Sequence, residues 1–125
     1  MLVILSASVH AQTQPAWAPR FNAALEDIRA GQADKGVHEL EALGAAFPKD
    51  AELLTSIGAA LDMGSRHRQA DGWYAKALAI NPGYEPALNN LALSLASQGR
   101  LAEALPLLEK VTRTDPHNGR AAYNL

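Results

Sequence analysis

The feature that most constrains the fold of this chain is an even spacing of three prolines. The interval from Pro48 to Pro82 equals the interval from Pro82 to Pro116. A fixed period of about 34 residues is typical of a repeat array, in which each unit packs only against its neighbours. Such arrays use an extended open surface for function. The spacing therefore predicts repeated units rather than one enclosed core around a catalytic pocket.

Apolar and small residues recur with the same period between the prolines. From Ala51 they are Leu54, Ile57, Gly58, Leu61, Ala70, Tyr74 and Ala77, and from Glu85 they are Leu88, Leu91, Ala92, Leu95, Ala104, Leu108 and Val111. The leucines and Ile57 have helical spacing and predict one buried stripe per first helix. The small residues are expected where the two helices of a hairpin cross, since a larger side chain would force them apart. Gly64 and Gly99 are expected in the turns, where a helix C-terminus often needs a positive φ.

These columns resemble the tetratricopeptide repeat (TPR) pattern W-x2-L-G-x2-Y, A-x3-F, P, with aliphatic residues in place of the Trp and the first Tyr. The resemblance is strong over residues 51–118. It implies an all-α fold of TPR-type helical-hairpin repeats that form a short right-handed α-solenoid. The expected organisation is a degenerate TPR-like repeat at 17–50, regular repeats at 51–84 and 85–118, and the start of an incomplete fourth repeat at 119–125.

Two places depart from a regular pattern. In the degenerate repeat Arg20 and Asp27 occupy columns that are apolar elsewhere, although an apolar stripe that includes Phe21 and Leu25 keeps its first helix amphipathic. Pro106 falls in the second helix of the third unit. A proline in the first turn of a helix costs little, so we expect Pro106 near the start of this helix, with a mild bend.

The N-terminus is expected to be a separate element. Residues 1–11 are a short apolar stretch with Val9 and Ala11 at the −3 and −1 positions of a signal-peptidase site, although a positive n-region is missing. We interpret them as a truncated signal peptide, followed by a linker at 12–16. This favours an exported, periplasmic protein, with a cytoplasmic protein as the alternative. The stretch is too short for a transmembrane segment, and without cysteine there is no lipid-modified cysteine.

The last residues predict an array without its usual capping helix. A helix that begins after Gly119 and stops at Leu125 is too short to be stable alone. Two interpretations remain open. Either the chain is a fragment of a longer protein, or this edge is completed by another molecule, including a second copy of the chain through self-association.

The composition argues against several function classes. A formal net charge of −2 provides no basic face for nucleic acid. The four histidines have no acidic partner at ligand spacing, so no metal site is expected, and no glycine-rich phosphate loop follows a strand. They are His10, His38, His67 and His117. We expect no cofactor and no enzymatic activity, and the run Arg66-His67-Arg68 is interpreted as a solvated turn.

The resemblance also implies a binding surface, because the first helices of TPR arrays line a concave groove. The groove positions carried over to this chain are Asn22, Glu52, Thr55, Ser56, Met63, Asn89, Asn90, Leu93 and Asn124. One column within them, made of Asn22, Ser56, Asn90 and Asn124, is polar throughout. Asparagine can pair with the backbone of a ligand; the alternative is that it is merely tolerated on an exposed helix. The family's chaperone-tail clamp needs Lys or Arg in the groove to hold a terminal carboxylate. The matching positions of this chain carry neither, which argues against a chaperone co-factor of that type.

The sequence therefore predicts a non-enzymatic protein–protein interaction scaffold that binds a peptide or partner protein in the concave groove. The alternative is a regulatory or substrate-presenting TPR arm of a larger envelope enzyme or assembly complex.

Overall fold

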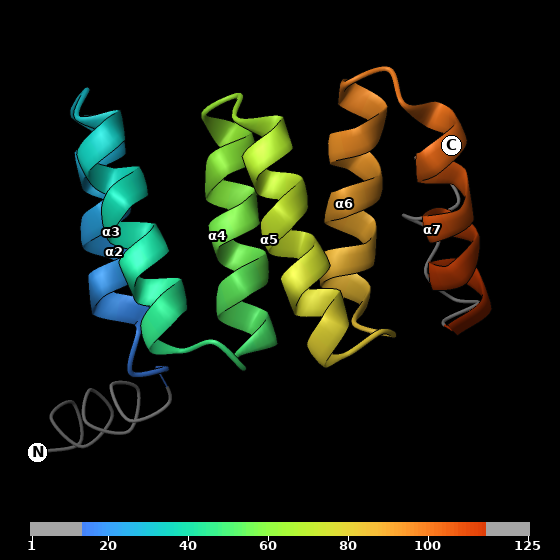
Figure 1. Ribbon diagram of the computed structural model, residues 1–125, viewed down its shortest axis with the longest axis horizontal. Coiled ribbons are helices and arrows are strands. Elements are labelled where there is room, and N and C mark those ends of the chain that lie inside the picture. The colour runs from blue at the N-terminus through green and yellow to red at the C-terminus, as the bar shows by residue number, and fades with distance from the viewer. Residues whose placement is uncertain (1–13, 115–125) are drawn as a thin grey trace, which may run out of the picture. The chain divides into compact units, whose positions relative to one another are not determined.

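A computed structural model of the chain describes residues 14–114, and these fold into six α-helices with no strand among them (Figure 1). The helices are α2 (Ala18–Arg29), α3 (Ala33–Ala46), α4 (Ala51–Met63), α5 (His67–Ile80), α6 (Glu85–Ser97) and α7 (Leu101–Thr114). The predicted all-α class and its helical hairpins are confirmed. No helix within residues 14–114 is long and apolar enough to cross a membrane. The predicted signal peptide at 1–11 and fourth repeat at 119–125 lie outside the described residues.

The first of two compact units, Met1–Leu43, holds α2 and most of α3. At Gly36 these two helices lie close together. A Cβ atom at this position would lie 2.5 Å from Ile28 Cγ1 and 2.6 Å from the carbonyl oxygen of Ala24. Gly36 lies one repeat before Ala70, and it thus does here what the sequence predicted for small residues where the helices of a hairpin cross.

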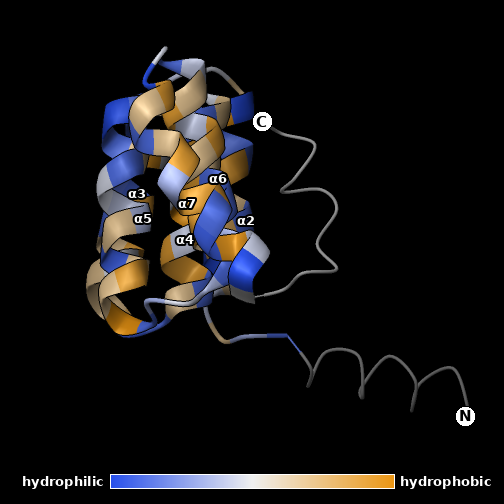
Figure 2. Ribbon diagram, turned by 90° about the vertical axis from the view of Figure 1, so that its right-hand side faces the viewer, coloured by the Kyte–Doolittle hydropathy of each residue, from blue (hydrophilic) through white to orange (hydrophobic). Residues whose placement is uncertain are grey.

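The second unit, Gly44–Leu125, contains α4 to α7 as described elements. Leu54, Ile57 and Leu61 on α4 are almost fully buried, which confirms the predicted stripe. On α6 the prediction is only partly right, because Leu91 is half-buried at the edge of the cluster that Leu88 forms with the apolar side of α7. Figure 2 shows hydrophobic and hydrophilic residues interspersed along the helices, as expected when each helix has an apolar and a polar side.

Gly58 allows the hairpin of α4 and α5 to close. A Cβ atom here would lie 2.5 Å from Cε1 of Tyr74, whose side chain is fully buried. The predicted crossing point is therefore confirmed, with the Tyr74 ring filling the space beside Gly58.

The turn after α4 differs from the prediction for Gly64. Its φ is −90°, and the left-handed residue is Ser65, with a φ of 60°. The cause is a Schellman-type ending, in which the Arg66 N–H donates to the Leu61 carbonyl at 2.8 Å. The turn after α6 ends in the same way. There Gly99, one repeat after Ser65, is the left-handed residue with a φ of 78°, as predicted.

The helix that contains Pro106, α7, begins at Leu101, and Pro106 lies in its second turn, beyond the first turn in which a proline costs little. Pro106 is the sixth residue of α7, so its missing N–H would otherwise have bonded the carbonyl of Ala102. Both residues are exposed, and water can therefore satisfy that carbonyl. This exposure explains how an interior proline is accommodated.

The strained backbone at Ser65 can be relieved by substitution. Ser65→Gly is expected to raise the free energy of unfolding by about 0.5–1 kcal/mol, because a residue with a side chain pays a penalty in the left-handed region. Urea denaturation of both proteins measures the change. Gly64→Ala is the control and should be near neutral, since a Cβ there meets only ordinary contacts. A loss of stability in Ser65→Gly would contradict the assignment.

Leu54 and Leu91 lie on the first helices of successive repeats, and Leu54 is the more deeply buried of the two. Truncating them to alanine should therefore lower the free energy of unfolding by different amounts. Leu54→Ala is expected to lower the free energy of unfolding by about 2–5 kcal/mol, the usual range for a buried leucine. Leu91→Ala should cost clearly less, because its side chain is half-exposed. Equal losses in thermal denaturation would show that the core boundary is misplaced.

Candidate functional site

The described part of the predicted groove is one face of α4 and α6, which contact each other within the second unit. On α4 this face contains Glu52 and Met63, which are exposed, and Ser56, which is half-buried. Met63 is the most exposed large hydrophobic side chain among the described residues, at 75%. The Ser56 hydroxyl donates to the Glu52 carbonyl at 2.9 Å, so its oxygen remains available as an acceptor.

On α6 the face consists of Asn89, Asn90 and Leu93, all half-buried. The Oδ1 atom of Asn89 is shielded from solvent and accepts no hydrogen bond. The same is true of Oε1 of Glu85, one helical turn earlier. An unpaired buried acceptor costs about 1–3 kcal/mol, so a donor that reached this part of α6 after a side-chain rotation would be favoured.

Of the other predicted groove residues, one is buried within the second unit, one belongs to the first unit and one lies outside the described residues. Thr55 is only 5% exposed, and its hydroxyl donates to the Ala51 carbonyl at 2.8 Å, so it presents little surface to a ligand. Because Thr55 is buried, the prediction that it contacts a ligand is corrected. Asn22 is exposed but belongs to the first unit, and Asn124 lies outside the described residues. Of the polar column, the structure brings Ser56 and Asn90 into one unit.

The electrostatics of this face are set by acids. Neither α4 nor α6 contains a Lys or Arg residue. Near the start of both helices, burial raises the pKa of Tyr84, and the negative charges of Glu52 and Asp50 raise it further. The face therefore suits a neutral or positively charged ligand better than an acidic one.

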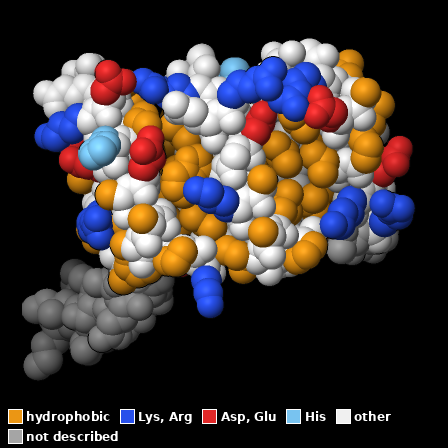
Figure 3. Space-filling view, viewed as in Figure 1, with side chains coloured by type: hydrophobic (Ala, Val, Ile, Leu, Met, Phe, Trp, Pro, Cys, Tyr) orange, Lys and Arg blue, Asp and Glu red, His pale blue; other side chains and the backbone are white. Residues whose placement is uncertain are grey.

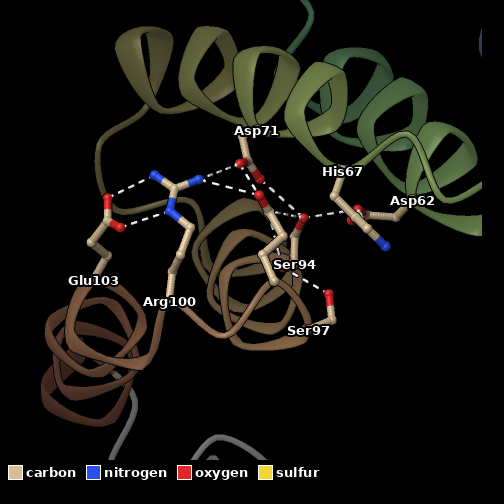
Figure 4. Close-up of polar contacts among 8 residues, drawn as sticks. Asp62, His67, Asp71, Ser94, Ser97, Arg100 and Glu103 are labelled. Carbon is tan, nitrogen blue, oxygen red and sulfur yellow. Dashed lines mark hydrogen bonds and ion pairs between the residues drawn. The ribbon is translucent and has the colours of Figure 1, made fainter.

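A polar network links α4, α5 and α6 at the opposite end of the second unit, and the sequence analysis missed it (Figure 4). Its centre is the carboxylate of Asp62 at the end of α4. Asp62 accepts hydrogen bonds from the Tyr74 hydroxyl at 2.7 Å and the Ser94 hydroxyl at 2.8 Å, and pairs with Nδ1 of His67 at 2.8 Å. Burial raises the pKa of Tyr74, as does its hydrogen bond to Asp62, so the phenol remains a donor.

A second carboxylate, Asp71 on α5, extends the network to the turn before α7. It accepts from the Ser94 hydroxyl at 3.0 Å, from Nε2 of Gln98 at 3.0 Å and from Nη1 of Arg100 at 3.2 Å. Ser94 is 3% exposed and has one hydroxyl hydrogen, which it shares between the two carboxylates. The network therefore fixes the position of α6 against the preceding hairpin.

The network corrects the expectation that no histidine has an acidic partner. His67 pairs with Asp62 across the turn, at a sequence separation that helical i, i+4 patterns do not reveal. His67 and Arg68 also belong to the first turn of α5, not to the solvated turn that was predicted. Within residues 14–114 no group of three His, Cys, Asp or Glu side chains could hold a metal ion.

Solved structures with the same fold were found at low sequence identity. YrrB, described as a TPR protein with an unusual peptide-binding site, superposes with a TM-score of 0.73 at 17% identity over 90% of this chain and 58% of its own. MamA from Desulfovibrio magneticus RS-1 gives 0.70 at 24% over 87% and 62%. The first TPR domain of Spaghetti (RPAP3), solved with the HSP90 peptide SRMEEVD, gives 0.71 at 20% over 86% and 88%. The chain thus spans about three fifths of YrrB and of MamA.

The family itself is identified by sequence. A search of curated proteins found no match. A model of the tetratricopeptide repeat family matches residues 60–125, which is more than half of the chain. Together with the helical hairpins, this match shows that the chain belongs to the tetratricopeptide repeat family.

Proposed function

We propose that this protein is a non-enzymatic interaction scaffold that binds a peptide or a partner protein on the face formed by α4 and α6. The observation that carries the proposal is the polar surface of α6, where Asn90 is half-buried beside the unpaired Oδ1 of Asn89. Side-chain amides can pair with the N–H and C=O groups of an extended ligand whatever its side chains. Export through residues 1–11 remains part of this proposal.

The charge of this face defines the preferred ligand. Because α4 and α6 carry no cation while Glu52 and Glu85 carry negative charge, a neutral or basic peptide meets no repulsion here. An acidic peptide such as the one bound by RPAP3 would lack a positive partner on this face. The ligand of the proposed scaffold therefore differs in charge from that of the chaperone-tail clamp, which holds a terminal carboxylate.

The binding face can be tested with a peptide selected from a random phage-displayed library on the intact protein. Ser56→Ala combined with Asn90→Ala is expected to weaken this peptide about tenfold, as the loss of two hydrogen bonds would. The free energy of unfolding of this variant should change by less than about 1 kcal/mol, since both side chains are partly exposed and neither belongs to the hydrophobic core. Isothermal titration calorimetry measures the affinity and urea denaturation the stability.

Glu109→Ala is the matched control, because Glu109 is exposed on α7 and away from this face. It should leave peptide affinity unchanged. The proposal fails if the double variant binds as tightly as the wild type, or if every selected peptide is strongly acidic.

A second candidate function, self-association, is favoured by two exposed leucines on α7. Leu101 and Leu105 are 56% and 41% exposed and lie one turn apart. They occupy the columns that His67 and Asp71 hold in α5 one repeat earlier, and Asp71 contacts Ser94 on the following helix α6 and Gln98 directly after it. This side of α7 therefore corresponds to the side of α5 that packs against another helix, and we propose that a second copy covers it.

Sedimentation velocity from micromolar to millimolar concentration tests this second candidate. A concentration-dependent dimer is expected for the wild type, and Leu101→Glu with Leu105→Glu should shift it to monomer while helicity is retained. Glu103→Ala, on the same exposed part of α7, controls for a nonspecific effect. A monomer throughout the range for the wild type would rule the dimer out.

A further inference from the structure

Two side-chain oxygen atoms on α6 are shielded from solvent and yet accept no hydrogen bond. They are Oε1 of Glu85 and Oδ1 of Asn89, and we call them the acceptor pair. The two residues lie four positions apart, so their side chains are neighbours on one side of the helix. Within residues 14–114 no N–H or O–H group donates to either atom, and no cation forms an ion pair with Glu85.

The same two columns carry no unpaired acceptor in the preceding repeat. One repeat earlier, Glu85 corresponds to Ala51 and Asn89 to Thr55. Ala51 packs against an apolar cluster, and the Thr55 hydroxyl donates to the Ala51 carbonyl at 2.8 Å. The hairpin of that repeat is thus built with neither a carboxylate nor an amide at these columns. The repeat architecture therefore does not explain the acceptor pair.

The place of Glu85 in the first turn of α6 explains only half of the pair. A carboxylate near a helix N-terminus is favoured by the partial positive charge there. Asn89 is the fifth residue of α6 and has no charge, so this effect does not account for its unpaired oxygen. A buried acceptor without a donor costs free energy, and such groups are rare in folded proteins. A donor that comes from outside the chain accounts for both atoms.

The charge at this end of the second unit is negative. Burial raises the pKa of Tyr84, directly before Glu85, and the charges of Glu52 and Asp50 raise it further. Neither α4 nor α6 contains a Lys or Arg residue. Figure 3 shows a group of Lys and Arg side chains, with acids among them, at the other end of the second unit, where α6 stops. Arg100 belongs to that end and is already paired with two acids. A positively charged donor is therefore what the start of α6 lacks.

We propose that the acceptor pair receives a cationic side chain, arginine or lysine, of the peptide or protein that binds the face of α4 and α6. The inference rests on the function proposed above and names the chemical group that this face recognises. A guanidinium or an ammonium group has several N–H donors and no acceptor, so it has donors for both oxygens. Its hydrogen bond to the Glu85 carboxylate is charge-assisted and therefore strong. Because the side chains of Glu85 and Asn89 are only half-buried, rotation about their own bonds brings both oxygens to the ligand.

The test is an NMR titration of the intact ¹⁵N-labelled protein with the N-acetyl methylamides of arginine and lysine at constant ionic strength. The same derivative of citrulline, which has the shape of arginine without its charge, is the control. Saturable shifts are expected for the side-chain amide of Asn89 with the cations and not with citrulline. Response to both cations defines a general cation site, and response to arginine alone defines a guanidinium site. The absence of saturation with either cation would overturn the proposal.

Glu85→Gln is the decisive variant, because it removes the charge and keeps the size of the side chain. It should weaken binding of the arginine derivative about tenfold, as the loss of a charge-assisted hydrogen bond would. Glu109→Gln removes the same charge from an exposed position on α7 and should leave binding unchanged. Equal binding by Glu85→Gln and the wild type would contradict the assigned location.

Asn89→Leu separates a ligand-binding role from a structural one. It should weaken binding and raise the midpoint of thermal unfolding, because an apolar side chain of similar size removes an acceptor that has no partner. If Asn89 served the fold instead, the midpoint would fall and binding would be retained, which would contradict the proposal.

Failure of this inference and failure of the proposed function give different results. If Ser56→Ala with Asn90→Ala weakens the phage-selected peptide while Glu85→Gln leaves its affinity unchanged, the function stands and the inference is wrong. If the double variant leaves the affinity of the peptide unchanged while Glu85→Gln abolishes saturation by the arginine derivative, the function is wrong and the acceptor pair remains a cation site.

Discussion

The packing of Tyr74 against Gly58 is the contact on which the second unit depends. A Cβ at position 58 would lie within the space of the phenol ring, so only glycine lets α5 approach α4 with Tyr74 buried. The buried ring directs its hydroxyl to Asp62, and Asp62 in turn receives Ser94 from α6. The absence of a side chain at Gly58 therefore determines both how α4 and α5 close into a hairpin and where α6 packs against them.

The repeat period predicted the helices well because it reports on packing. Leucines that must face a core, small residues that must let helices cross and prolines that follow helices are all restricted in side-chain size or backbone shape. The conformation of the turn after α4 was not predicted, because Ser65 takes the left-handed conformation that Gly99 takes in the next repeat. Glycine at 64 misled the prediction because the Schellman geometry, and not the residue type, decides which position turns.

The functional surfaces were less predictable for a physical reason. The groove positions follow from the repeat register, yet the burial of Thr55 and the unpaired Oδ1 of Asn89 depend on neighbours that the sequence does not specify. The Asp62 network is hidden for the same reason, because Asp71 and Ser94 lie on two different helices and 23 residues apart, beyond any spacing within one helix. A repeat pattern describes what successive units share, whereas a polar network depends on how they differ.

Those differences separate two surfaces of opposite charge within one unit. The face of α4 and α6 has acids and amides without a cation, while a cleft at the start of α5 has arginines without an acid in its lining, which consists of Ser65, Arg66, His67, Arg68, Gln69 and Gln98. Gln69 and Glu103 are one pair of equivalent positions that differ in charge. At the start of α7, Glu103 and Arg100 satisfy each other within the chain. In α5 the equivalent residue, Gln69, has no charge and cannot form this ion pair.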